Sequence, residues 1–301
     1  MAQTDPERCE PVTTGRKAMV SFTKIPLPID YSEHCMAVAR QAIDLAVHFG
    51  SEITALRVLA PVSDSVPGTL DTSVGRLAIR RRRGWAQMDN FVRAHLRHVS
   101  VRPVLCDGDP AAEILKQAAQ GGSDLIMMPT HGFNACRRLL LGSVAAKCLH
   151  EAVCPVWTGR HRPRASNLEP ASLSHIVCAI ALGSVGCRGL DWAAKLAEAF
   201  HSALTLLYLA PRADLPTDKR CDLPWRCHAF TDGSAVISRR PKLVSRQILV
   251  ETGDVSKTVS VLAERLNADL LVLDNSPPNG VRLSNVEYEI IRASSSSVLR
   301  V

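Results

Sequence analysis

The chain has 301 residues, which is enough for two domains of ordinary size, each able to bury its own core. Apolar residues make up 46% of it and charged residues 22%, a composition that is typical of globular proteins and excludes a disordered chain. The formal net charge of +7 is compatible with an acidic ligand or surface, but both halves share the excess, so no dedicated basic domain is indicated.

No sign of export or of membrane insertion is visible in the sequence. Its apolar runs are shorter than the ~18 residues that a membrane span needs, and the first residues lack the apolar core of a signal peptide. Ten cysteines are scattered without a Cys-x-x-Cys pair, so we expect mostly buried free thiols, with Cys136, Cys221 and Cys227 left to test for reactivity. These observations predict a cytoplasmic protein with no membrane partner.

In chain order, the first half alternates strands with helices. Residues 24–30 form a short apolar run that ends on Asp30 and predicts a strand, and the spacing of the apolar residues after it predicts a helix that stops at Gly50. Strands that alternate with helices indicate a parallel sheet covered on both faces. The same signals predict strands at 52–59, 99–105, 124–128 and 154–157 and helices at 74–98, 110–120 and 142–151.

The second half repeats the first. Residues 25–46 match residues 176–197 at a constant offset of 151, and Gly108-Asp109 recurs as Gly253-Asp254. A repeat of this length indicates a duplicated domain rather than one large domain. We therefore predict two tandem domains, each a doubly wound parallel sheet in a Rossmann-like α/β/α sandwich.

The predicted organisation is a flexible N-terminus, a first domain, a linker and a second domain, at residues 1–20, 21–159, 160–172 and 173–301. The linker has no apolar period and carries two prolines. An irregular insertion at about 211–242 interrupts the second domain, and its residues suggest no role.

Candidate ligand-binding residues gather at the carboxyl ends of the predicted strands, where ligands bind to open parallel sheets. Asp30 could accept hydrogen bonds from an adenine amino group or from ribose hydroxyls. Gly132 and Gly142 let backbone N–H groups approach a phosphate, and a helix that starts near Ser143 points its positive end at the same anion. The complete candidate set is Pro28, Asp30, Val58, Met128, Pro129, Gly132, Gly142, Ser143 and Val144.

Three separated motifs, Thr130-His131-Gly132, Leu140 to Val144 and Cys154-Pro155-Val156, resemble the universal stress protein family. The resemblance covers about 22–158 and, more weakly, 174–301. ATP-binding members of that family carry Gly-x-x-Gly, nine residues, and then Gly-Ser or Gly-Thr. The resemblance implies a stress-response regulator without catalytic activity that binds ATP, with Mg²⁺. It also implies that Asp30 meets adenine, that Val58 flanks the nucleoside, and that the glycine loop with Gly132, Gly142, Ser143 and Val144 wraps the phosphates.

Pro129 departs from this pattern, because it stands where the first glycine belongs. Proline has no backbone N–H and a fixed φ, so a contact that needs a donor or a positive φ at this position is lost. The alternative function is therefore a protein-interaction or dimerisation module that binds no nucleotide and keeps a retired site.

The second half departs further from the pattern and predicts a degenerate, structural domain. Ala181 stands at the position of Asp30, Pro277 at that of Gly132, and Ser284-Asn285 at that of Gly142-Ser143. At most one nucleotide per chain should bind. Enzymatic turnover has no support, because no Ser/His/Asp order, metal cluster or Walker lysine accompanies the loop, although slow ATP hydrolysis is not excluded.

Other charged and polar clusters suggest weaker hypotheses. The run Arg80–Arg83 forms either a solvated helix face or a contact for an anionic partner, and nucleic acid is disfavoured because only Trp85 and Phe91 are available for stacking. His95 and His98 lack a third ligand nearby, so no metal site is predicted.

The last strands of the two halves, at 154–157 and 297–301, could pair within one chain and form an internal pseudo-dimer, as universal stress domains commonly do between chains. The sequence is also compatible with an unidentified protein partner and with a homo-oligomer.

Overall fold

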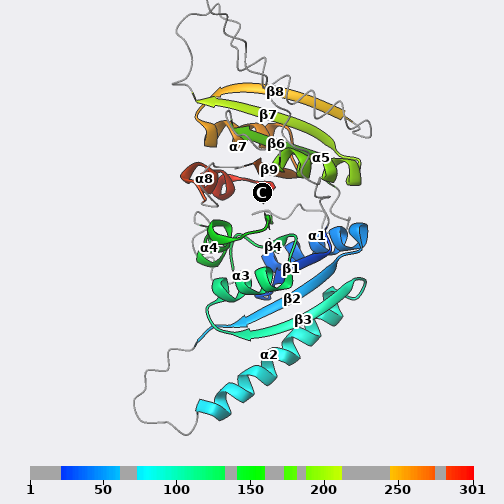
Figure 1. Cartoon of the computed structure of the whole chain (residues 1–301), viewed down its shortest axis with the longest axis vertical. Helices are drawn as coiled ribbons and strands as arrows, with labels where there is room; N and C mark the ends of the chain where they lie inside the picture. Colours follow the sequence, from blue (N-terminus) through cyan, green and yellow to red (C-terminus); the bar gives the residue numbers. More distant parts are fainter. Residues whose placement is uncertain are drawn as a thin grey trace, which may run out of the picture.

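A computed structural model describes residues 22–61, 73–132, 141–159, 173–181, 188–211, 245–274 and 283–301. Two α/β halves are stacked end to end along the long axis of the molecule, and the C-terminus lies between them (Figure 1). The predicted tandem of doubly wound α/β domains is confirmed as a fold class. The predicted flexible N-terminus, the linker 160–172 and nearly all of the insertion lie outside the described residues.

In both halves most described strands are followed by a helix, and in the first half this follows the predicted alternation. The first half consists of β1 (Lys24–Pro28), α1 (Glu33–Phe49), β2 (Glu52–Leu59), α2 (Ser73–His95), β3 (Ser100–Asp107), α3 (Pro110–Gly121), β4 (Ile126–Met128), α4 (Ser143–Glu151) and β5 (Val156–Thr158). The second half consists of β6 (His175–Ala181), α5 (Arg188–Phe200), β7 (Ala203–Pro211), β8 (Ser245–Gly253), α7 (Val255–Arg265), β9 (Leu270–Asp274), α8 (Asn285–Ala293) and β10 (Ser297–Arg300).

Helices cover both faces of the strands. Buried residues of α1, α2 and α5 form one core cluster with one side of the strands, and buried residues of α3, α4, α7 and α8 form a second cluster with the other side. This two-sided burial explains why the strands read as nearly continuous apolar runs in the sequence.

The described strands form two sheets rather than one sheet per half. The order is β1-β2-β3 in the first sheet and β4-β5-β10-β9-β6-β7-β8 in the second. All strand pairs are parallel except β5 with β10, which run antiparallel and join the halves. The predicted pairing of the two last strands within the chain is thus present. The strands of the first half are divided between the two sheets, because β4 and β5 belong to the larger one.

Two prolines in β1 explain this division. The Ile29 N–H donates to the Leu56 carbonyl of β2 at 2.8 Å, whereas the Lys24 carbonyl accepts from Asp124 at 3.1 Å, just before β4. Because backbone groups alternate sides along a strand, the even-numbered residues of β1 face β4, and these include Pro26 and Pro28. Proline offers no N–H for a ladder, so β1 lies beside β4 without a regular ladder.

The backbone scaffold outside this seam is nevertheless repeated. The Asp124 carboxylate accepts from the N–H groups of Thr23 and Lys24 at 2.7 and 3.0 Å. In the second half, the Asp269 carboxylate accepts from Ser174 and His175 at 2.8 and 3.1 Å. These matched contacts support the duplication that the sequence predicts.

The repeated Gly-Asp pairs have a local structural role. Gly108 and Gly253 adopt φ values of 146° and 151°, a region that favours glycine. Asp109 and Asp254 then cap α3 and α7 by accepting backbone N–H groups of the first turn at 2.9 and 3.2 Å.

Side chains reinforce the junction between the halves. The Trp157 indole donates to the Gln41 side chain at 3.2 Å, and the Gln41 amide donates to the Ser297 hydroxyl at 3.0 Å. Phe22 packs edge-on against Trp192 with ring centroids 4.8 Å apart. Backbone, polar and aromatic contacts therefore all connect the two halves.

Candidate functional site

The predicted site lies where the order of the strands reverses. From the carboxyl end of β1 the chain enters α1 on one side of the strands, and from the carboxyl end of β4 it continues toward α4 on the other side. Open α/β sheets bind ligands at such a crevice. The segments Ile29–Ser32 and Pro129–Gly132 meet here, at the end of the seam that has no ladder.

Asp30 and Gly132, predicted to act together, are neighbours in space. The Asp30 Oδ1 accepts from the backbone N–H and the hydroxyl of Ser32 at 2.9 and 2.7 Å. The Asp30 Oδ2 faces Gly132, where an added Cβ would lie only 3.0 Å away. Ser32 thus orients the carboxylate, and the absence of a side chain at Gly132 keeps space beside its second oxygen.

The two ends of the glycine loop are held together. The Gly142 N–H donates to the Thr130 carbonyl at 2.9 Å, and a Cβ at Gly142 would meet that carbonyl at 3.1 Å. The N–H of Gly142 is therefore engaged within the protein, and its glycine character serves the close approach of two backbone segments. Residues 133–140, including Cys136, lie outside the described residues.

The first turn of α4 has no side-chain cap. Gly142 is the N-cap residue and supplies no side-chain cap, and the first turn contains no acidic residue. An α-helix leaves the N–H groups of its first residues without intrahelical acceptors, here those of Ser143, Val144 and Ala145. Together with the helix dipole, such an end attracts an anion.

The first turn of α8 occupies the matching place in the second half but is closed. Ser284 is the N-cap residue, and its hydroxyl accepts from the Glu287 N–H at 3.2 Å while the Glu287 carboxylate accepts from the Ser284 N–H at 2.8 Å. The other carboxylate oxygen of Glu287 accepts from Arg300 Nε at 2.9 Å, and both side chains are buried. The protein's own carboxylate therefore occupies the N-terminal end of α8.

The remaining candidates line the same edge without forming one cluster. Pro28 and Met128 are the last residues of β1 and β4, and Met128 is buried. Val58 lies near the end of β2, half-buried on the α3 and α4 side, where Val144 also packs. No described contact joins Val58 to Asp30 or to the glycines, so its predicted position beside a nucleoside stays a prediction.

Pro129 follows β4 directly and is half-buried. Since the Met128 carbonyl accepts from the Gly159 N–H on the β5 side at 3.1 Å, the backbone of Pro129 faces β1. Its missing N–H therefore belongs to the same seam as Pro26 and Pro28.

Several residues of the site were missed from the sequence. Ser32 orients Asp30, and Tyr31, at φ 65°, lies beneath the Arg57 guanidinium at 5.0 Å. His131 is buried in the turn, with its Nδ1 3.1 Å from the Thr130 hydroxyl. A Ser-x-x-Glu capping signal at Ser284 was visible in the sequence and predicts the closed end of α8.

The described cysteines are free thiols, and those near the site are not activated. Burial raises the pKa of Cys35, whose Sγ lies 3.6 Å from the Pro28 carbonyl, to about 12, and burial raises the pKa of Cys148 to about 12 as well. Among the described residues, no group of His, Cys, Asp and Glu could hold a metal ion. No described helix is long and apolar enough to cross a membrane.

Comparison with known proteins finds one family along nearly the whole chain. The model of the universal stress protein family matches residues 21–160 and 173–301. A universal stress protein of Methanocaldococcus jannaschii is 30% identical over 144 residues, which make up 45% of this chain and 80% of that protein. A universal stress protein of Thermus aquaticus is 33% identical over 139 residues, or 45% of this chain and 96% of that protein.

The fold also has counterparts among solved structures. A universal stress protein from Archaeoglobus fulgidus has a TM-score of 0.68, and the match covers 93% of this chain and 97% of that chain. The two sequences are 20% identical, so this likeness concerns the fold.

Proposed function

Because the chain belongs to the universal stress protein family, we propose that it is a stress-response regulator whose first half binds one adenine nucleotide, ATP with Mg²⁺. The second half binds none and acts as a structural partner. Regulation proceeds by binding rather than by turnover. The free thiols of the described residues favour a reducing compartment, in line with the expected cytoplasm.

The difference between the two helix ends carries this proposal. The first turn of α4 has a glycine N-cap, no side-chain cap and no acid, whereas the first turn of α8 is capped by Ser284 and Glu287. At the N-terminus of α4 a phosphate would be stabilised in two ways, by hydrogen bonds to backbone N–H groups of the first turn and by the helix dipole. At the second end it would meet a buried carboxylate that is already bonded to Arg300.

Each candidate residue then has a defined role. The Asp30 Oδ2 accepts from the adenine amino group or a ribose hydroxyl, because its other oxygen is committed to Ser32. Ser143 and Val144 donate backbone N–H groups to phosphate oxygens, and the exposed Ser143 hydroxyl adds a donor. Gly132 and Gly142 keep the approach free of side chains.

The remaining candidates would provide apolar contacts to the nucleotide. Pro28, Val58 and Met128 supply apolar contacts along the strand ends, and Pro129 contributes no donor. Mg²⁺ bound together with the nucleotide would offset part of the phosphate charge.

A charge substitution at Ser143 tests this function. Ser143→Asp places a carboxylate beside the phosphate position, and we expect ATP to bind roughly tenfold more weakly, since adjacent like charges repel by ~1 kcal/mol even in water. Ser143→Asn introduces a side chain of the same shape as Asp but without the charge, and this variant should bind ATP nearly as well as the wild type. ATP-dependent thermal stabilisation of the intact chain measures both.

The same pair of variants guards against a folding artefact. Without ATP, Ser143→Asp should be at least as stable as the wild type, because an acid at a helix N-terminus contributes ~0.3–1 kcal/mol. Equal ATP binding by the Asp and Asn variants would show that the nucleotide does not contact α4.

A further inference from the structure

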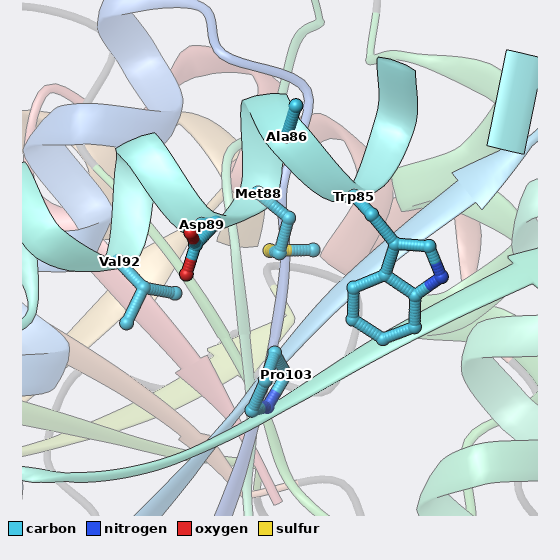
Figure 2. A pocket seen from close by; sticks show the side chains of 6 residues that line it. All are labelled: Trp85, Ala86, Met88, Asp89, Val92 and Pro103. Atoms are coloured by element: carbon cyan, nitrogen blue, oxygen red, sulfur yellow. The ribbon is translucent and has the colours of Figure 1, made fainter. Parts of the chain in front are cut away.

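A groove separate from the nucleotide site lies between α2 and β3. It has a volume of about 300 Å³ and is lined by Trp85, Ala86, Met88, Asp89, Val92 and Pro103. Figure 2 shows the side chains of Trp85, Met88 and Val92 pointing from α2 toward the strand that carries Pro103, while Ala86 points away from it. We call this concave surface the α2 groove.

The walls of the α2 groove are apolar and partly uncovered. Met88 is fully buried and forms the floor, whereas Trp85 is 42% exposed. Among the described strands, β3 pairs only with β2, so it ends its sheet, and α2 lies along its outer side (Figure 1). The volume is at the low end of ligand pockets, which span ~300–1,000 Å³, and suits one or two large side chains better than a cofactor.

A strong positive charge surrounds the groove. Residues 73–107 contain eight arginines and two aspartates, a formal charge of +6 out of +7 for the whole chain. Of the arginines, Arg81 pairs with Asp107 and Arg93 pairs with Asp89. Arg82 and Arg83 are exposed and have no ion-pair or hydrogen-bond partner among the residues that the structure describes.

Arg82 is the uncommitted charge on the groove side of α2. It precedes Trp85 by three residues and Asp89 by seven, which places all three on one flank of the helix. Arg83 has the same spacing to Ala86 and Asn90, so it belongs to the other flank. Asp89 at the groove is already neutralised by Arg93.

We propose that the α2 groove binds an acidic segment of a partner protein, with a large apolar side chain against Trp85 and a carboxylate facing Arg82. The positive electrostatic field of the arginines attracts such a segment. Tryptophan and arginine are also among the residue types that most often dominate the binding energy of an interface. This proposal does not depend on nucleotide binding.

Other occupants fit the same surface less well. Nucleic acid needs several stacking platforms, but Trp85 is the exposed aromatic of the patch and Phe91 is buried. A membrane needs a continuous apolar face, but the exposed Leu77 and Ile79 are two residues apart and point to different sides of α2. A second copy would bring one cationic surface against another.

Selection from a display library of random peptides on the intact chain tests the proposal. We expect enriched peptides to place Asp or Glu beside Leu, Ile, Phe or Trp. A synthetic enriched peptide should bind roughly tenfold or more weakly to Arg82→Glu and to Trp85→Ala, and Trp85→Phe should restore much of the loss.

Arg83→Glu is the matched control, because it changes the net charge equally on the opposite flank of α2. It should weaken binding far less than Arg82→Glu. The proposal is overturned if no peptide is enriched, if enriched peptides lack acids, or if both arginine variants bind alike. Competition by a single-stranded oligonucleotide or by phosphatidylserine vesicles, with the same dependence on Arg82, would assign the surface to those ligands instead.

Discussion

The first turns of α4 and α8 hold the same place in the two halves of the molecule but present opposite chemistry. In α4 the N-cap residue is a glycine without a side-chain cap, whereas in α8 Ser284 and Glu287 cap the N–H groups of the N-cap residue and of the third helical residue. At the positions of Glu287 and Arg300 the first half has Ala145 and Thr158. The difference teaches that a duplicated domain can diverge at a helix end by placing a buried ion pair of its own there.

The strands beside these helices also differ between the halves, in how completely their backbones are hydrogen-bonded. In the second half β6 pairs with β9 along a regular ladder, whereas in the first half Pro26 and Pro28 interrupt the corresponding seam between β1 and β4. The half with the open helix end therefore also has the less hydrogen-bonded crevice. Its closed counterpart is held by backbone bonds and by a buried salt bridge.

The largest effect should follow from breaking the closed end of α8. Glu287→Ala leaves Arg300 buried without its carboxylate, and we expect the free energy of unfolding to fall by ~3–5 kcal/mol. Urea denaturation of the intact chain measures the change.

The matched control for that substitution copies the first half. The double variant Glu287→Ala with Arg300→Thr removes both charges and should recover most of the lost stability, because no buried charge is left unpaired. A loss below ~1 kcal/mol in the single variant would show that the pair does not hold α8.

A smaller effect should come from a size swap between the halves. At the end of β5, a Cβ added to Gly159 would overlap the Cγ2 of Val38 on α1. The second half has the reversed pair, Val301 directly after β10 and Gly189 on α5. Gly159→Ala should lower the stability by ~1–3 kcal/mol.

Adding Val38→Ala to that variant makes room and isolates the cause. The double variant should then be clearly more stable than the summed stability losses of the two single variants predict, because the effects of contacting residues are not additive. Strict additivity in thermal unfolding would mean that the chain relieves the overlap elsewhere.

The smallest effect concerns backbone exchange at the two seams. Met127 in β4 and Val272 in β9 hold matching positions, and their N–H groups face β1 and β6. We expect the Met127 amide to exchange with solvent about tenfold faster or more, because its seam lacks a full ladder and opens at a lower free energy. Residue-resolved hydrogen exchange tests this, and equal protection would show that the prolines do not loosen the crevice.

Local sequence signals were sufficient for much of the fold. Hydrophobic periodicity located the elements, and the repeated Gly-Asp pairs took the turn and cap positions that their chemistry favours. The sequence also identified Asp30 and Gly132 as partners, since both follow strands that end at one edge of a sheet.

The rest depends on contacts that sequence spacing does not encode. The division of the first half between two sheets depends on which neighbouring strand the backbone of Pro26 and Pro28 faces. Sequence spacing alone does not give that direction. The Ser284 and Glu287 signal predicts a capped helix, but the pairing of Glu287 with Arg300 arises only when β10 packs beside α8. In the same way, Gly142 was expected to offer its N–H to a phosphate, and instead it donates to Thr130.

Calorimetric titration of ATP with Mg²⁺ into the intact chain tests the central claim most directly. We expect saturable binding of one ATP per chain, weakened by Asp30→Ala and strengthened by Pro129→Gly. Binding by Pro129→Gly alone would support a retired site in an interaction module. An absence of heat at millimolar ATP in both the wild type and Pro129→Gly would contradict the claim that the open end of α4 receives a nucleotide.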